Sequence, residues 1–186
     1  MSYDPNLANR LSSLRTEAYV GDVVRATRHN ADPTAPSFYG GRWARAQNGD
    51  PGTNVLYTSM EVDGAMAEVA SFLAALTPVP GPTQIKVTRL AVSTSKCLRL
   101  LRADLVDLGV DMPLYGERDY GCTQEIGSTL AWLGVDGLIA PSARWGCDNL
   151  MIFTDNLAST EKLDPISEQL IEWREWARVN GLLDLS

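Results

Sequence analysis

The sequence has few of the residues on which many enzymes depend. Histidine occurs once, as His29, in a chain of 186 residues. The three cysteines, Cys97, Cys122 and Cys147, are an odd number and form no Cys-x-x-Cys pair. These shortages argue against a disulfide framework, a zinc site and most Ser/His/Asp or Cys/His mechanisms. Any acid–base chemistry is therefore expected from carboxylates, from tyrosine or from the substrate itself.

Long apolar runs are absent as well. No apolar stretch approaches the ~20 residues that a membrane-spanning helix needs. The N-terminal sequence MSYDPNLANRL has an early acid and no apolar segment, so no signal peptide is expected and the expected location is the cytoplasm. The length predicts one domain that can bury a sizeable core.

Positive charge is scarce overall but locally concentrated. The net charge is −7 and the pI is about 4.7, which argues against a protein that binds nucleic acid. Residues 20–45 nevertheless hold four arginines against two acids, whereas residues 155–186 hold seven acids against three bases. A basic pocket in an acidic body suits a small anionic ligand.

The hydrophobic pattern predicts short strands that alternate irregularly with helices. Strands are expected at residues 22–27, 54–58, 84–92, 96–101, 137–140 and 150–153, and helices after Asp4-Pro5, from Thr58 to about Leu76, at 104–108, at 123–133 and at about 165–181. The last of these is expected to be amphipathic. The order does not repeat a βαβ unit, so the predicted fold class is α+β, a single compact domain with small mixed sheets and flanking helices.

Glu68 is the carboxylate whose position most invites a functional explanation. It lies three residues after Ala65 and four before Phe72, and therefore borders the buried stripe of its predicted helix. A carboxylate there is costly unless it is hydrogen-bonded or needed. The structural alternative is an acid that reaches solvent or pairs with an arginine, and spacing alone favours that alternative.

Two arginines are candidates for binding an anion. Arg42 follows Gly40 and Gly41, which allow a tight turn and a close approach of the backbone to a ligand. Its planar guanidinium matches phosphate and carboxylate groups, although a surface ion pair explains Arg42 equally well. Arg25 lies within the first predicted strand, and its side chain faces either solvent or a ligand.

Tyr57 and Ser142 have ordinary structural explanations when each is taken alone. Tyr57 ends the strand before the Glu68 helix, where core packing accounts for a tyrosine. Ser142 follows a buried strand in a Pro-Ser turn, where serine is common. The chain contains neither GxGxxG nor GxxxxGK[ST], so it carries no nucleotide-binding fingerprint of those kinds.

Together, four segments resemble the RES-domain family, named for an Arg, a Glu and a Ser and made up largely of bacterial toxins from toxin–antitoxin pairs. The matching segments are VVRAT (23–27), YGGRW (39–43), NVLYTS followed by AMAEV (54–69), and DGLIAPSAR through GCDNLMIF (136–153). The family pattern carries over to Arg42, Tyr57, Glu68 and Ser142, and Arg25 falls where the family has a strand arginine. The AQNGD insert at 46–50 departs from the pattern.

The resemblance implies a fold similar to ADP-ribosyltransferases and NAD+ as the substrate, with inorganic phosphate as a conceivable co-substrate and no further cofactor. The implied function is an NAD+-degrading toxin that cleaves the nicotinamide–ribose bond by phosphorolysis or hydrolysis and inhibits growth by depleting NAD+. One alternative is a mono-ADP-ribosyltransferase that modifies a cellular protein. A further alternative is a non-enzymatic module with a decayed site.

The resemblance also implies roles for the residues. Glu68 would stabilise an oxocarbenium-like state and hold a ribose hydroxyl. Arg42 and Arg25 would bind the pyrophosphate or an incoming phosphate. Tyr57 would stack on nicotinamide or ribose, and Ser142 would hydrogen-bond the nicotinamide amide or the ribose.

Partners and domain limits follow from the same resemblance. The expected protein partner is an Xre-type helix-turn-helix antitoxin, with neither direct nucleic-acid binding nor a membrane contact. The whole chain, 1–186, would be one RES-like domain with its core at about 20–156 and the amphipathic helix at about 165–181.

Overall fold

The computed structural model describes residues 4–46 and 52–183, in which strands and helices alternate irregularly. The elements are, in chain order, α1 (Pro5–Ser12), β1 (Thr16–Arg28), β2 (Val55–Ser59), α2 (Val62–Ala74), β3 (Gln84–Arg99), α3 (Arg102–Asp107), η1 (Met112–Leu114), α4 (Gly121–Trp132), β4 (Gly137–Pro141), β5 (Asp148–Phe153), η2 (Thr154–Asn156), β6 (Leu163–Glu172) and α5 (Trp173–Val179). Within these ranges no helix combines the length and apolar character needed to cross a lipid bilayer.

Hydrogen bonds connect the six strands of the described chain into one mixed sheet, in the order β1-β2-β5-β4-β3-β6. The pairing of β3 with β4 is parallel and the other pairings are antiparallel. β1 also pairs with β3 along its length, so the ladder returns to its first strand. The predicted α+β class with a mixed sheet is confirmed.

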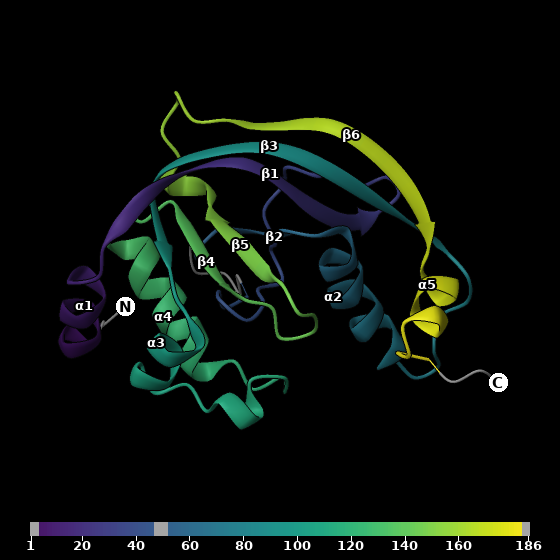
Figure 1. The fold of residues 1–186 in the computed structure, drawn as a ribbon, viewed down its shortest axis with the longest axis horizontal. Helices are drawn as coiled ribbons and strands as arrows, with labels where there is room; N and C mark the ends of the chain where they lie inside the picture. Colours follow the sequence, from purple (N-terminus) through teal and green to yellow (C-terminus); the bar gives the residue numbers. More distant parts are fainter. Residues whose placement is uncertain (1–3, 47–51, 184–186) are drawn as a thin grey trace.

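The length of β3 allows one strand to join two layers. Figure 1 shows β6, β3 and β1 side by side in an arch, with β4, β5 and β2 beneath it. The first half of β3 pairs with β6, and Cys97–Arg99 pair with β4. The strands that were expected separately at residues 84–92 and 96–101 are therefore one continuous, bent strand.

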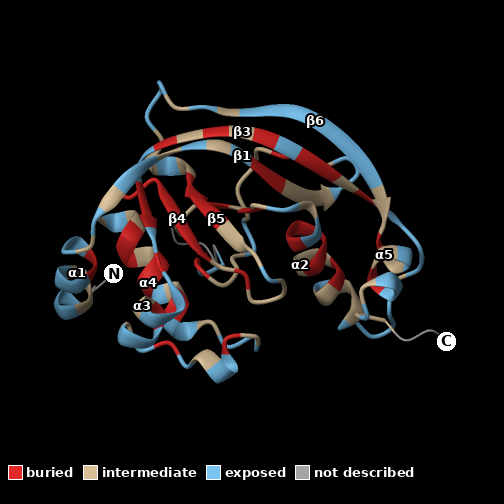
Figure 2. Cartoon of the chain, viewed as in Figure 1, coloured by how far each residue is buried: buried red, intermediate tan, exposed pale blue. Residues whose placement is uncertain are grey.

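The helices form two groups under the ends of the arch (Figure 1). α2 and α5 pack below one end, where Met66 and the fully buried Trp173 meet Val87 of β3. α1, α3 and α4 pack below the other end, where Leu105 and Leu130 belong to the same buried cluster. Figure 2 shows that buried residues concentrate on the inner sides of both groups and on β4 and β5. The strands β2 and β5 lie between the two groups.

The amphipathic helix predicted over about residues 165–181 is wrong in its first half. Leu163–Glu172 form β6, antiparallel to β3, and only Trp173–Val179 are helical. Ile166 and Leu170, which suggested a buried stripe, are 52 % and 51 % exposed. Pairing along the edge of β3 satisfies the backbone of this segment and overrides its local helical pattern.

Most of the remaining predicted elements lie within a few residues of the observed ones, whereas the strand predicted at 22–27 begins six residues earlier, as part of β1 (Thr16–Arg28). The helix that was expected to begin at Thr58 begins at Val62, because Thr58 belongs to β2 and its hydroxyl donates to the carbonyl oxygen of Leu150 at 2.7 Å. Gly134 follows α4 with φ = 72°, the left-handed conformation in which a glycine commonly ends a helix. Residues 47–50 of the AQNGD insert lie outside the described residues.

Gly127 sets how closely α4 approaches the chain at Trp43. A Cβ atom at position 127 would lie 2.0 Å from the carbonyl oxygen of Trp43. We predict that Gly127→Ala lowers the free energy of unfolding by about 2 kcal/mol, because overpacking of this kind costs about 1–3 kcal/mol and exceeds the gain in helix propensity of about 1 kcal/mol.

Chemical denaturation measures the effect of Gly127→Ala. Gly116→Ala is the matched control, since a Cβ atom there meets no atom within 4 Å. Unchanged or increased stability of Gly127→Ala would show that α4 and the Trp43 segment are not in the close contact described.

Candidate active site

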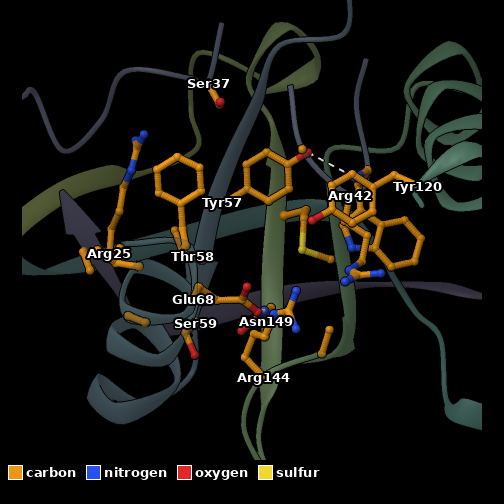
Figure 3. Close-up of a pocket in the computed structure, with 18 of the residues that line it drawn as sticks. Arg25, Ser37, Arg42, Tyr57, Thr58, Ser59, Glu68, Tyr120, Arg144 and Asn149 are labelled. Carbon is orange, nitrogen blue, oxygen red and sulfur yellow. Dashed lines mark hydrogen bonds between the residues drawn. The ribbon is translucent and has the colours of Figure 1, made fainter. Parts of the chain in front are cut away.

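A cavity of about 370 Å³ opens between α2, the strands β1, β2 and β5, and the segments around residues 37–43 and 115–120. Its described lining includes four arginines and one glutamate, namely Arg25, Arg42, Arg118, Arg144 and Glu68. Figure 3 labels Glu68 and three of these arginines, Arg25, Arg42 and Arg144. The cavity therefore has a cationic lining, although the chain carries a net charge of −7. Its size is within the usual range for small-molecule sites, and its charge favours an anionic ligand.

Glu68 projects from α2 into this cavity and is held by one side chain from β5 and one from the segment that follows β4. Its Oε1 accepts hydrogen bonds from Ser142 Oγ at 3.0 Å and from Asn149 Nδ2 at 3.1 Å. Glu68 forms no ion pair with any residue that the structure describes. The structural alternative of an arginine pair therefore does not apply, and hydrogen bonds offset the cost of placing the carboxylate here.

Ser142 lies behind Glu68, where its hydroxyl is fully engaged. The residue is 2 % exposed, and its Oγ accepts from the backbone N–H groups of Arg144 and Trp145 at 3.1 and 3.2 Å while it donates to Glu68. A hydroxyl has one hydrogen and two lone pairs, so this set uses all of them. Ser142 therefore supports Glu68 in this arrangement, and its predicted contact with nicotinamide or ribose remains a prediction.

Tyr57 forms one wall of the cavity from β2. Its hydroxyl accepts a hydrogen bond from the backbone N–H of Trp43 at 3.1 Å (Figure 3). Burial raises the pKa of Tyr57, so the phenol is neutral at physiological pH. The ring lies so close to Gly41 that a Cβ atom there would be 2.8 Å from it. The second glycine of the Gly-Gly pair is thus needed for its contact with this tyrosine.

A compact turn presents Arg42 to the cavity. Gly40 has φ = 70°, and the N–H of Gly41 donates to the carbonyl oxygen of Ala44 at 2.8 Å. Gln124 of α4 donates through Nε2 to the carbonyl oxygen of Gly41 at 2.9 Å. The helix α4 therefore holds the turn in place, and the turn fixes where the Arg42 side chain begins.

The Arg42 guanidinium is itself positioned by aromatic rings. Its Cζ lies 4.5 Å from the ring centroid of Tyr115 and 4.8 Å from that of Tyr120. Its Nη2 also donates to the carbonyl oxygen of Glu117 at 3.4 Å. These contacts limit the conformational freedom of the side chain and leave other guanidinium N–H groups for a ligand.

Arg25 supports the cavity from β1. Its Nη1 donates to the carbonyl oxygens of Pro33 and Ala35 at 2.9 and 2.5 Å. Burial lowers the pKa of Arg25 to about 10, so the side chain stays protonated at neutral pH. It therefore anchors the loop that precedes the Gly-Gly turn, and its predicted contact with a phosphate remains a prediction.

Several residues of the cavity were not singled out in the sequence, namely Asn149, Arg144, Arg118, Tyr115 and Tyr120. Asn149 stands in a polar pair at the start of an apolar strand, which is a weak signal. The others lie in irregular segments, where functional residues are frequent but no periodicity marks them. Arg118 donates to the carbonyl oxygen of Ser71 at 3.2 Å and lies over the ring of Phe72, so the segment that carries it touches α2.

The arrangement brings together a fixed carboxylate, an aromatic wall and a cationic rim. Such a site can bind a phosphate-bearing ligand at the rim and stabilise positive charge that develops beside the carboxylate. In the described ranges, no three His, Cys, Asp or Glu side chains gather as a group that could hold a metal ion. The predicted residues Arg25, Arg42, Tyr57 and Glu68 all line the cavity, and Ser142 contacts it through Glu68.

Comparisons with known proteins identify a related family and a similar fold. The model of the RES domain matches residues 19–174 of this chain. The MbcT toxin in the crystal structure of the M. tuberculosis MbcT–MbcA toxin–antitoxin complex is similar with a TM-score of 0.77 and 15 % sequence identity, over 97 % of this chain and 100 % of that chain. A search of curated proteins finds no match.

The Tyr57 hydroxyl is expected to matter for stability as well as for the shape of the cavity. Tyr57→Phe leaves the N–H of the buried Trp43 without its acceptor. We predict a loss of about 1–3 kcal/mol in the free energy of unfolding, the usual cost of such a group. Tyr39→Phe is the control, because Tyr39 is 93 % exposed. If both variants are equally stable in chemical denaturation, the Tyr57–Trp43 hydrogen bond does not contribute as described.

Proposed function

This chain belongs to the RES-domain family, and we propose that it is a toxin of a toxin–antitoxin system that cleaves the nicotinamide–ribose bond of NAD+. RES-domain toxins are in general NAD+-processing enzymes. The observation that carries the proposal is the position of Glu68, whose carboxylate is fixed by hydrogen bonds from Ser142 and Asn149. The other charged side chains in the described lining of the cavity are arginines, and aromatic rings lie beside them.

The proposed reaction breaks the bond between the ribose C1′ and the pyridinium nitrogen. The bonding electron pair leaves with nicotinamide, which departs as a neutral molecule and needs no general acid. The ribose is left with positive charge shared between C1′ and its ring oxygen. Glu68 stabilises that charge and accepts a hydrogen bond from a ribose hydroxyl. This reaction needs no histidine as a general acid, which agrees with a chain that contains one histidine.

The other walls of the cavity provide binding and shielding in this proposal. The Arg42 guanidinium, steadied by two tyrosine rings, binds an oxygen of the pyrophosphate, and Arg25 adds positive charge from β1. Tyr57 presents a neutral ring to nicotinamide and ribose, which limits the access of water to the cation. These contacts orient the glycosidic bond toward Glu68.

The bond to C1′ is completed by an acceptor. Water gives ADP-ribose and a proton, phosphate gives ADP-ribose 1″-phosphate, and a protein side chain gives an ADP-ribosylated protein. We propose degradation of NAD+ with water or phosphate, which would inhibit growth by depleting NAD+. Product identification after incubation with labelled NAD+, in buffer with and without phosphate and with cell lysate, assigns the acceptor, and label on a protein band would favour the mono-ADP-ribosyltransferase alternative.

An antitoxin partner is part of the proposal. The fold is similar to that of MbcT, which was solved in complex with its antitoxin. We propose a cognate antitoxin for this chain as well, of the Xre-type helix-turn-helix class that the sequence resemblance implies. Co-expression tests this: the cognate antitoxin should copurify with the chain and suppress nicotinamide release.

The central test of the proposed function is nicotinamide release from NAD+. The wild-type protein is expected to turn over NAD+, and Glu68→Gln is expected to lower kcat by about 100-fold or more, because it removes the charge opposite the developing cation. High-performance liquid chromatography of the products measures both rates.

Glu61→Gln is the matched control for this test. Glu61 precedes the same helix, is exposed and makes no side-chain cap for it. Its substitution should leave turnover unchanged. The proposed function is contradicted if the wild-type protein releases no nicotinamide in either buffer, and the role of Glu68 is contradicted if folded Glu68→Gln remains active.

A further inference from the structure

We propose that Asn149 is a positioning residue, an inference that rests on the proposed function: together with Ser142 it fixes the Glu68 carboxylate so that Oε1 is held by the protein and Oε2 is left for the substrate. Both donors converge on Oε1, at 3.0 Å from Ser142 Oγ and 3.1 Å from Asn149 Nδ2. No described residue donates a recorded hydrogen bond to Oε2. Figure 3 shows Asn149 directly beside Glu68 in the cavity.

The backbone gives Asn149 the rigidity that positioning requires. Asn149 is the second residue of β5, which lies between β2 and β4 in the sheet. It is aligned with Ser59 on one side and with Ala140 on the other. Ser142 follows directly after β4, and Asn149 lies near the start of the neighbouring strand β5. Each therefore places one donor beside the Glu68 carboxylate, which comes from α2. The carboxylate is thus held between a helix and a sheet whose separation is set by the core.

The orientation of the Asn149 amide indicates that its role is to donate a hydrogen bond to the Glu68 carboxylate. Its Oδ1 is buried, and no described residue donates a hydrogen bond to it. A buried acceptor without a partner costs about 1–3 kcal/mol, so the position is not explained by folding stability alone. Turning the amide around would place Oδ1 against Oε1 of Glu68, two acceptors facing each other. The observed arrangement is therefore the one that serves an ionised Glu68.

Tyr57, Tyr115 and Cys147, which lie near Glu68, do not titrate in the neutral range. The carboxylates of Glu61 and Asp148 also act on this region and are the same in every Asn149 variant. Burial raises the pKa of Tyr115 to about 12, and burial raises the pKa of Tyr57 and of the Cys147 thiol above their ordinary values. Arginine side chains in general keep their charge at these pH values. Glu68 carries the one carboxyl group among the described lining residues. A second carboxyl group at position 149 should therefore change the pH profile of kcat.

Asn149→Asp is the variant that tests the inference through the pH profile. It keeps the size of the side chain but replaces the donor Nδ2 with a carboxylate oxygen opposite Glu68. Near neutral pH two adjacent carboxylates repel, and kcat is expected to fall by about 100-fold. Toward about pH 5 the pair shares one proton, an O–H donor is restored, and activity is expected to recover by about tenfold relative to the wild-type protein.

Asn149→Ala provides a second variant that does not depend on the new charge. Because Asn149 touches Glu68 and its own oxygen is buried, this change should lower kcat by about tenfold while the KM for NAD+ stays within about twofold. A selective rise in KM would instead show that Asn149 binds the substrate directly and would overturn the inference.

Asn156→Asp is the matched control. Its Nδ2 donates to the carbonyl oxygens of Ala131 and Val135, and Asn156 is not among the described residues that line the cavity. The same substitution there should lower stability without changing the shape of the pH profile. If Asn149→Asp behaves in this way too, or shows wild-type activity at neutral pH, Asn149 does not position Glu68.

A measurement without turnover separates this inference from the proposed function. Carbon-13 NMR of the Glu68 carboxyl group, assigned by its absence in Glu68→Gln, follows its titration in the wild-type protein and in Asn149→Asp. A midpoint that moves to higher pH in Asn149→Asp supports the contact even if no nicotinamide is released, in which case only the proposed function fails. An unmoved midpoint overturns the inference whether or not the protein turns over NAD+.

Discussion

The hydrogen bonds that Ser142 and Asn149 donate to Glu68 Oε1 are the interaction on which the site depends. They join α2 to the end of β4 and the start of β5, through residues 74 and 81 positions after Glu68 in the sequence. The pairing of β5 with strands on both sides keeps the two donors in register. The buried face of α2 keeps the carboxylate at the right distance from them. The core packing of the domain thus determines which carboxylate oxygen faces the cavity.

The opposite wall of the cavity is held by equally specific contacts. The Gly41 turn lies against the ring of Tyr57, and Gln124 of α4 binds the carbonyl oxygen of that turn. The absence of a side chain at Gly127 lets α4 approach closely enough to make this bond. Arg42 is then stacked on aromatic rings, so its charge is presented at the rim at a small cost in conformational freedom. Gly41 and Gly127 thus allow a close approach between the elements that form the site.

Sequence reasoning predicted residues that line the cavity but not the hydrogen bonds between its side chains. The α+β class and most strands could be predicted because they depend on local periodicity. Arg42, Tyr57 and Glu68 were selected only by the set of motifs that resembles the family, because each of them alone had a structural explanation. The segment that became β6 was misassigned, since only its pairing with β3 distinguishes it from an amphipathic helix. Asn149 was missed because its partner is 81 residues away in sequence. The three hydrogen bonds of the Ser142 hydroxyl were not predicted either, because nothing in the local sequence indicates them.

The most direct test of the central claim is whether the site binds the cation that the proposed reaction would form. An NAD+ analogue in which a protonated iminosugar replaces the nicotinamide riboside carries that charge without reacting. Isothermal titration calorimetry should show that the wild-type protein binds this analogue about 100-fold or more tightly than NAD+, as expected for a mimic of the transition state, and that Glu68→Gln loses this preference. Equal affinity for the analogue and for NAD+, or a preference that survives in Glu68→Gln, would contradict the account.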